Sequence, residues 1–315
     1  MPGIHERIVG GVVGLAVGDA LGVPVEFLSR EAARRKNVLG MTGPGTHHQA
    51  PGTWSDDSSM ALCTLASLID KGYEPRDMMQ RFSDWRFKGY MAARGREVFD
   101  VGITTHAAIS RYKEGAPTPW GGSGERDNGN GSLMRILPLS LFVADRPVED
   151  IVKMNFEVSA LTHAHIRSQL CCALFSLVVR GLLRGEPLDS SLRSATQALE
   201  SSIPAKEREP LKRILSGAVL TLDEDEISGD GYVVHTLEAS LWCCARYEAY
   251  RDAVLAAVNL GGDTDTTGAV TGALAGVMHG LEAIPQEWRE QIARSGDVHE
   301  MAWKLANKIA GLKPA

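Results

Sequence analysis

The sequence predicts an all-α protein, and three observations carry that prediction. Apolar residues recur at helical spacing over 56–70, 150–184, 233–258 and 264–281. Strict alternation of apolar and polar residues over the length of a strand is nearly absent. The composition, with 44% hydrophobic and 23% charged residues, is typical of a chain that folds around a core. We therefore expect many helices packed around one core and joined by Gly/Pro-rich loops.

Three loops connect these helical stretches, at 40–55, 115–131 and 222–231. None of them is long or biased enough to link independent domains, and no internal repeat of fixed period is present. A single domain over residues 1–315 is therefore the expected organisation.

Two stretches carry a glycine at every fourth residue. On a helix such spacing forms one bare stripe along a single face. Glycine inside a helix costs up to about 1 kcal/mol relative to alanine, so a stripe is expected where another backbone approaches closely. Close packing would also bring together the carboxylates beside the stripes, which include Asp19 and Glu26. The two stripes are Gly10, Gly14, Gly18 and Gly22, and Gly268, Gly272, Gly276 and Gly280.

The overall charge and the cysteines limit the possible partners and the compartment. A formal net charge of −6 gives no basic field, so we expect no binding to nucleic acid or to an anionic membrane surface. No segment reaches about 18 uninterrupted apolar residues, so no membrane span is expected. The five cysteines show no C-x-x-C spacing, which favours a reduced, cytoplasmic protein.

Two clusters of carboxylates and hydroxyls each precede an apolar helical run. Capping of the helix that follows would explain either cluster alone. Four carboxylates brought together, however, would repel one another unless they were protonated or neutralised by cations. Oxygen ligands of this kind suit Mg²⁺ or Mn²⁺, so a site for two such ions is the sharper hypothesis. The clusters are Ser55, Asp56 and Asp57, and Asp263, Asp265 and Thr266.

A glycine-rich loop, "GGSGERDNGNGSLMRILPLSL" at 121–141, ends at 129–132 and leads into an apolar helical run. Free backbone N–H groups and the helix dipole would face an anion there. The loop lacks the G-K-[ST] ending of a nucleoside triphosphate loop, and such loops are usually only turns. A pyrophosphate cradle would nevertheless fit beside divalent cations.

Six motifs occur together in a fixed order: "GLAVGDALGVPVEF", "GTWSDDSSMAL", "FDVGITTHAAI", "GNGSLMR", "LTHAHIRS" and "NLGGDTDTTGAVTGALAG". In this order and spacing the chain resembles the ADP-ribosylglycohydrolase family over nearly its whole length. The resemblance implies an all-helical fold with two Mg²⁺ or Mn²⁺ ions in a central cleft. It also implies an enzyme that acts on an ADP-ribosylated protein and releases ADP-ribose.

The family motifs assign roles to single positions of this chain. Glu26 matches a glutamate near the ions and the scissile ribose, and Ser55 stands where threonine is common. His163 matches a histidine of the ADP-ribose pocket, although a histidine in the core is the ordinary reading of such a residue. The metal ligands implied are Ser55, Asp56, Asp57, Asp263, Asp265 and Thr266, and the diphosphate loop implied is Gly129, Asn130, Gly131 and Ser132.

Asp100 bears on which bond is cleaved. In the arginine-specific branch of the family an aspartate occupies this position of the D-V-G-x-T-T motif, near the substrate guanidinium. A carboxylate can form a forked, charge-assisted pair with a planar guanidinium. Without the resemblance, Asp100 would be read as an exposed loop acid. Tyr232, which follows the acidic loop, is a candidate contact for the adenine.

The expected activity is hydrolysis of the N-glycosidic bond between ADP-ribose and arginine. The ions would orient the water, Glu26 would act as base or stabilise the cationic sugar, and Asp100 would hold the departing guanidine. Three alternatives stay open: hydrolysis of serine-linked or O-acetyl ADP-ribose, another two-metal nucleotide hydrolase, and a non-catalytic ADP-ribose-binding relative. The last would be expected to have lost ligands that this chain has kept.

Overall fold

Helices make up nearly all of the regular structure. The computed structural model describes residues 2–311, and in that part the only β pairing is two isolated bridges, Gly122 with His163 and Gly129 with Tyr232. The prediction of an all-α protein is confirmed. The α-helices are α1 (Ile4–Gly22), α2 (Arg30–Lys36), α3 (Asp56–Lys71), α4 (Pro75–Lys88), α5 (Ile103–Lys113), α6 (Leu137–Phe142), α7 (Val148–Ser159), α8 (Ile166–Leu183), α9 (Leu188–Leu199), α10 (Lys212–Leu215), α11 (Val233–Arg246), α12 (Tyr250–Asn259), α13 (Thr264–His279), α14 (Gln286–Gln291) and α15 (Ser295–Gly311).

Two of the predicted helical stretches are single helices and two are pairs. The stretches 56–70 and 264–281 form α3 and α13. The stretch 150–184 divides into α7 and α8, because a turn closed by the 2.8 Å bond from His163 N to Ser159 O separates them. The stretch 233–258 likewise divides into α11 and α12. Apolar spacing could not find the first break, because the turn residue Leu161 is itself buried.

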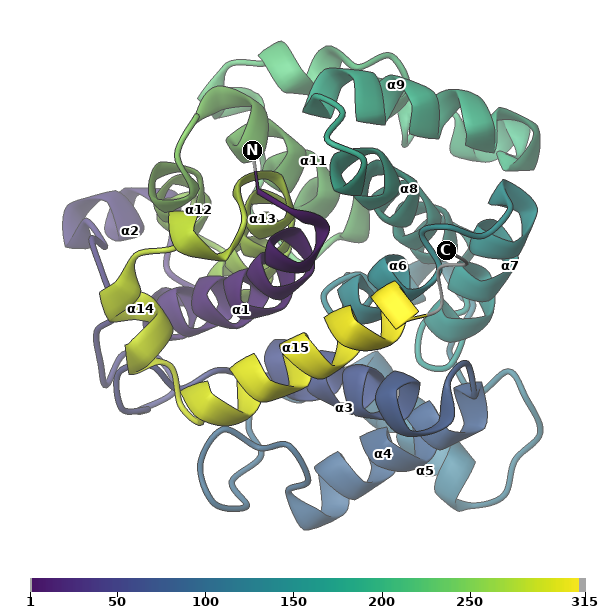
Figure 1. Ribbon diagram of the computed structural model, residues 1–315, viewed down its shortest axis with the longest axis horizontal. Helices are drawn as coiled ribbons and strands as arrows, with labels where there is room; N and C mark the ends of the chain where they lie inside the picture. Colours follow the sequence, from purple (N-terminus) through teal and green to yellow (C-terminus); the bar gives the residue numbers. More distant parts are fainter. Residues whose placement is uncertain (1, 312–315) are drawn as a thin grey trace.

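The glycine stripes of α1 and α13 face each other. Figure 1 shows the two helices next to each other inside the bundle. A methyl group placed on Gly14 would lie 2.3 Å from the carbonyl oxygen of Gly272, and one on Gly18 would lie 2.0 Å from that of Gly268. Side chains of any size are therefore excluded from this contact. The predicted close packing is confirmed, and it sets the N-terminal end of α13 against the C-terminal end of α1.

Two helical segments are long and apolar enough to cross a membrane by length and composition, Ile4–Val25 and Ile166–Leu183. The most apolar window of the first is 100% buried inside the fold, and that of the second is 72% buried. Both segments contribute to the hydrophobic core, as α1 and α8. Their hydropathy is thus accounted for by packing within the protein.

Candidate metal and substrate site

The two predicted acidic clusters meet where α3 and α13 begin. The Thr266 hydroxyl donates a 3.3 Å hydrogen bond to Asp57 Oδ2 across the junction of the two helices. The Ser55 hydroxyl donates to the same oxygen at 3.2 Å. All three side chains are buried. The fold therefore joins residues that lie more than two hundred positions apart in the sequence.

Capping of α3 is performed mainly by Asp19, a residue that was not among the predicted site residues. Its carboxylate accepts hydrogen bonds from Ser55 N at 2.9 Å, from Ser58 N at 2.9 Å and from the Ser58 hydroxyl at 2.6 Å. Ser55, at the N-cap position, also accepts a bond from Asp57 N. Because Asp19 and Ser55 accept these bonds, the carboxylates of Asp56 and Asp57 are not needed to cap α3. The only sequence signal for Asp19 was its place beside the first glycine stripe.

Asp263 occupies the N-cap position of α13 but makes no side-chain cap hydrogen bond. Its Oδ2 instead accepts a 2.9 Å bond from the Asn130 amide of the glycine-rich loop. Asn130 also donates to the Thr236 hydroxyl at 2.9 Å. The side chain of Asp263 is therefore held toward the loop, and capping does not explain it.

The carboxylates of this cluster have oxygens that no protein group satisfies. Asp57 Oδ1, Asp263 Oδ1 and Asp265 Oδ2 are buried and have no hydrogen-bond partner among the described residues. Leaving a buried acceptor unpaired is costly, and charged acceptors are the most costly. Oxygen atoms of Glu26, Asp263 and Asp265 also lie within 4.8 Å of one another. Convergent, unpaired carboxylate oxygens of this kind fit a hard divalent cation.

The pKa shifts of these carboxylates point to the same lack of nearby positive charge. Burial, and then the negative charges of neighbouring carboxylates, raise the pKa of Asp56, Asp57 and Asp265 well above the ordinary value. Burial raises the pKa of Asp19 to about 6. The same two causes raise the pKa of Glu26 to about 10, with Asp100 as the largest charge. Without a cation the cluster therefore holds protons at neutral pH.

Divalent cations are expected to stabilise the protein more strongly as the pH rises. Carboxylates whose folded-state pKa is raised keep protons that the unfolded chain releases above about pH 4. Stability of the metal-free protein should therefore fall from that pH upward. A fixed cation concentration should offset more of the loss at higher pH, because Kd falls as the ligands lose their protons; the gain is about 2.7 kcal/mol where the concentration is a hundred times Kd. Thermal unfolding with EDTA, Mg²⁺ or Mn²⁺ at pH 5.5 and pH 8 measures this, and an equal shift at both values would contradict it.

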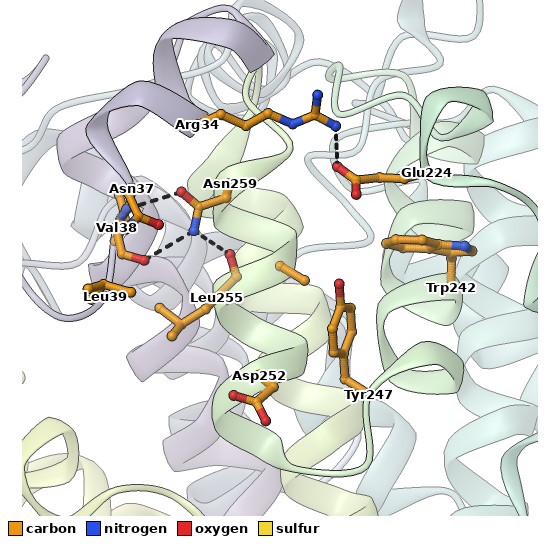
Figure 2. A pocket seen from close by; sticks show the side chains of 11 residues that line it. Arg34, Asn37, Val38, Leu39, Glu224, Trp242, Tyr247, Asp252, Leu255 and Asn259 are labelled. Atoms are coloured by element: carbon orange, nitrogen blue, oxygen red, sulfur yellow. Dashed lines mark hydrogen bonds and ion pairs between the residues drawn. The ribbon is translucent and has the colours of Figure 1, made fainter.

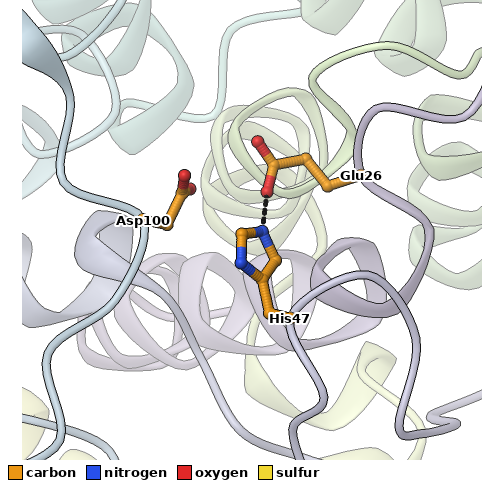
Figure 3. A group of neighbouring side chains, drawn as sticks. All are labelled: Glu26, His47 and Asp100. Carbon is orange, nitrogen blue, oxygen red and sulfur yellow. Dashed lines mark hydrogen bonds and ion pairs between the residues drawn. The ribbon is translucent and has the colours of Figure 1, made fainter.

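A second group of side chains lies beside the carboxylate cluster and consists of Glu26, His47 and Asp100 (Figure 3). His47 Nε2 pairs with Glu26 Oε2, and ligand atoms of all three residues lie within 4.8 Å of one another. Burial raises the pKa of Asp100, while the nearby His47 opposes that shift. Asp100 is thus half-buried beside Glu26 and is not an isolated loop acid. His47 was missed because a histidine in the loop 40–55 gives no signal of its own.

A pocket of about 290 Å³ opens over both groups. Its walls bring together the carboxylate cluster, the start of α5 and the glycine-rich loop, and none of its described lining residues is Lys or Arg. The predicted site residues that line it are Glu26, Asp56, Asp100, Gly129, Asn130, Gly131, His163, Asp263 and Thr266.

His163 and Gly131 form one wall of this pocket by close contact. A methyl group on Gly131 would lie 2.6 Å from His163 Cε1, so only glycine fits there. His163 Nδ1 lies 2.9 Å from the Thr162 hydroxyl. Burial, and then the charge of Arg135, lower the pKa of His163 to about 3. The His163 imidazole is therefore neutral and largely buried, and it also lines the pocket. It is at once a core histidine and a pocket residue.

The helix expected directly after the glycine-rich loop begins later than the sequence indicated. Residues 131–135 form turns, and α6 starts at Leu137. Pro138 explains the delay, because proline is tolerated in the first turn of a helix but not in its interior. A helix dipole therefore does not point at the loop. The backbone N–H groups of Gly131 and Ser132 have no recorded hydrogen bond within the described chain, so the turn itself supplies the donors.

Ser132 and Tyr232 lie next to the pocket without lining it. The Ser132 hydroxyl is buried and accepts a 2.9 Å bond from Ser159, so only its backbone faces the loop. Tyr232 is joined to the loop through its bridge to Gly129, and its ring lies under the Arg167 guanidinium at 5.7 Å. The predicted adenine contact of Tyr232 stays a prediction.

A separate pocket of about 400 Å³ lies between α2, α11 and α12 (Figure 2). Arg34 and Glu224 form an ion pair at one end of it, and Asn259 binds the backbone of Val38 at its side. None of its described lining residues has a buried polar atom without a partner, and none belongs to the predicted site. The smaller pocket is therefore the better candidate for chemistry.

Comparison with known proteins agrees with this geometry. The model of the ADP-ribosylglycohydrolase family matches residues 1–315. The chain is 32% identical to ADP-ribosylarginine hydrolase Tri1 of Serratia proteamaculans (strain 568), over 95% of this chain and 79% of that protein. It is also 32% identical to the ADP-ribosyl-dinitrogen reductase glycohydrolase of Rhodospirillum rubrum, over 92% of each chain.

A solved structure described as an ADP-ribosylglycohydrolase-related protein complex superposes with a TM-score of 0.83 at 32% identity, covering 98% of this chain and 99% of the other. The chain thus belongs to the ADP-ribosylglycohydrolase family, shares its all-α fold, and is a hydrolase of that family.

Proposed function

We propose that this protein hydrolyses the N-glycosidic bond between ADP-ribose and the guanidine of a modified arginine side chain in a protein. The observation that carries the proposal is the position of Asp100, whose carboxylate lies beside Glu26 and lines the pocket over the acidic cluster. A carboxylate there can accept a forked hydrogen bond from a guanidinium. Two relatives at 32% identity bear the name ADP-ribosylarginine hydrolase, which supports the same substrate.

Two Mg²⁺ or Mn²⁺ ions would be held by the cluster at the starts of α3 and α13. The unpaired oxygens of Asp57, Asp263 and Asp265 are its free ligand atoms. Such ions, when bound, act as Lewis acids and orient the attacking water. The full set of proposed ligands is Ser55, Asp56, Asp57, Asp263, Asp265 and Thr266.

The glycine-rich loop would bind the diphosphate of ADP-ribose. The backbone N–H groups of Gly131 and Ser132 have no recorded hydrogen bond within the described chain, and Gly129 and Gly131 add no side chain that would block an approach. Asn130 donates a hydrogen bond to Asp263 and so holds the loop against the acidic cluster. His163, neutral and buried, completes this wall.

Glu26 would stabilise the positive charge that develops on the ribose or take a proton from the attacking water. Its contact with His47 orients the carboxylate, and a bound cation would lower its pKa from the value in the empty cluster. Asp100 would hold the guanidine as the bond to ribose C1″ breaks. Neither role needs a lysine or arginine in the pocket.

The direct test incubates the purified protein with arginine-ADP-ribosylated and serine-ADP-ribosylated protein, with EDTA, Mg²⁺ or Mn²⁺. Free ADP-ribose and intact arginine are the expected products, and they should form only with a divalent cation. Mass analysis of the products separates this reaction from phosphoester cleavage. Release from serine alone would exclude the arginine bond as the substrate, and release from neither would exclude the proposal as a whole.

Replacing Asp100 with asparagine should lower kcat/KM for ADP-ribosylarginine by about 10- to 100-fold, because a hydrogen bond to a charged group contributes about 1.5–3 kcal/mol. The neutral amide keeps the size of the side chain but loses the charge that pairs with the guanidinium. Steady-state release of ADP-ribose measures the change. An Asp84→Asn variant, altered at an ion pair with Lys88 in α4 and outside the pocket lining, serves as the control. Equal kinetics of the two variants would contradict the role of Asp100.

A further inference from the structure

Two large apolar side chains are exposed at the mouth of the pocket. Phe27 is 66% and Ile103 is 89% exposed, whereas the lining residue Glu26 is only 3% exposed. Single exposed apolar residues are ordinary on protein surfaces. Two at one mouth are different, because this pocket carries two of the five large hydrophobic residues that are exposed in the described chain.

The backbone of Phe27 is held in a conformation that its side chain disfavours. Its φ of 64° lies in the left-handed region, where a bulky residue is an outlier and glycine or asparagine is more usual. Hydrogen bonds fix this turn, from Phe27 N to Gly262 O at 2.7 Å and from Gly262 N to Leu28 O at 2.8 Å. A strained residue that also exposes an aromatic ring to water indicates a functional role.

Aromatic contacts extend this surface across the mouth. The His47 ring lies 5.9 Å from the Phe27 ring and 5.1 Å from the Phe99 ring, measured between centroids. Phe99 immediately precedes Asp100, and Ile103 opens α5 three residues further on. We call Phe27, Phe99 and Ile103 the apolar rim. It borders the group formed by Glu26, His47 and Asp100.

We propose that the apolar rim docks the polypeptide surface that flanks the ADP-ribosylated side chain, and that it selects protein substrates over small molecules. This inference rests on the proposed function. A modified side chain whose sugar lies in the pocket keeps its own backbone within one side-chain length of the mouth. The residues flanking it in the target must then cover the rim, and apolar groups among them gain by leaving water there. A small ADP-ribosylated guanidine has no flanking polypeptide, so it leaves the exposed parts of Phe27 and Ile103 uncovered.

The test compares two substrates that differ only in what surrounds the guanidine: an arginine-ADP-ribosylated protein and a small ADP-ribosylated guanidine compound. Phe27→Asn keeps the left-handed turn and removes the ring, and Ile103→Ser removes the second side chain. The double variant is expected to raise KM for the protein at least about tenfold, the effect of losing a central apolar contact. KM and kcat for the small compound should change less than twofold. Leu39→Ser, altered at an exposed leucine away from this mouth, is the matched control.

A proportionate loss on both substrates would overturn the proposal, because the rim would then shape the pocket itself. Unchanged kinetics on the protein would overturn it as well. If the wild-type protein releases ADP-ribose from neither substrate, the proposed function fails. The role of the apolar rim is then tested by measuring binding instead of turnover. The double variant should then bind immobilised ADP-ribosylated protein more weakly than the wild type does, while its affinity for free ADP-ribose stays the same. An unaltered affinity for the protein would overturn the inference.

Discussion

Replacement of Asp265 with alanine is expected to abolish metal-dependent release of ADP-ribose, with a fall in kcat/KM of about 10³-fold or more. A divalent cation contributes several kcal/mol of charge stabilisation, and each 1.36 kcal/mol corresponds to a tenfold change in rate. Asp265 is fully buried, its Oδ2 has no partner, and its oxygens converge with those of Glu26 and Asp263. Release of ADP-ribose with and without Mn²⁺ measures the effect.

Two controls separate loss of the ions from loss of the fold. Asp225→Ala removes an acid whose side chain is 92% exposed, and it should leave activity unchanged. The Asp265→Ala variant should have an unfolding temperature at least as high as that of the metal-free wild type, because it lacks one buried carboxylate that its neighbours repel. It should also gain no thermal stability from Mg²⁺ or Mn²⁺. Normal turnover by this variant after metal removal would disprove the two-ion site.

A single methyl group at Gly18 is expected to destabilise the protein severely. Alanine is the better helix former by up to about 1 kcal/mol, so propensity alone predicts a gain in stability. The added carbon would nevertheless lie 2.0 Å from the Gly268 carbonyl oxygen, and α1 and α13 would have to separate. Overpacking of this kind costs about 1–3 kcal/mol or more, and we expect a loss of at least about 3 kcal/mol in the free energy of unfolding.

Gly296 provides the matched control for this substitution. It lies in α15, and a methyl group there would have no neighbour within 4 Å. Gly296→Ala should therefore not destabilise the protein, and any gain should stay below about 1 kcal/mol, because Gly296 lies in the first turn of α15 and not in its interior. If the backbone contact determines the outcome, urea denaturation should show a large loss of stability for Gly18→Ala and no loss for Gly296→Ala. A stabilised Gly18→Ala variant would show that α1 and α13 do not pack through their glycines.

Much of the fold was predictable because its two strongest signals are local and periodic. Helical spacing found α3 and α13, and the glycine stripes indicated which two helices touch. Spacing failed at the break between α7 and α8, because the buried turn residue Leu161 continues the apolar pattern. It also failed at the break between α11 and α12, where residues 247–249 are partly or fully exposed. It also placed a helix directly after the glycine-rich loop, where Pro138 delays the start to Leu137.

Less of the site was predictable, because part of it depends on contacts between distant segments. The pairing of the two acidic clusters followed from their composition, since each was unusual by itself. Asp19 and His47 have no such local signal. Asp19 matters because the fold places it against Ser55 and Ser58, and His47 matters because the fold places it against Glu26. The direction of a side chain is equally invisible in the sequence. Ser132 lies in a predicted binding loop, yet its hydroxyl points into the core.

The glycine contact between α1 and α13 also determines when the site can come into existence. Asp57 and Thr266, which hydrogen-bond across the cluster, are separated by 209 positions. A ribosome must therefore synthesise most of the chain before the second half of the ligand set is available. Until α13 packs against α1, the early segment carries carboxylates with no partner ligands. Loading with metal is thus expected to follow synthesis, so an early shortage of cations would delay activity without preventing the chain from being made.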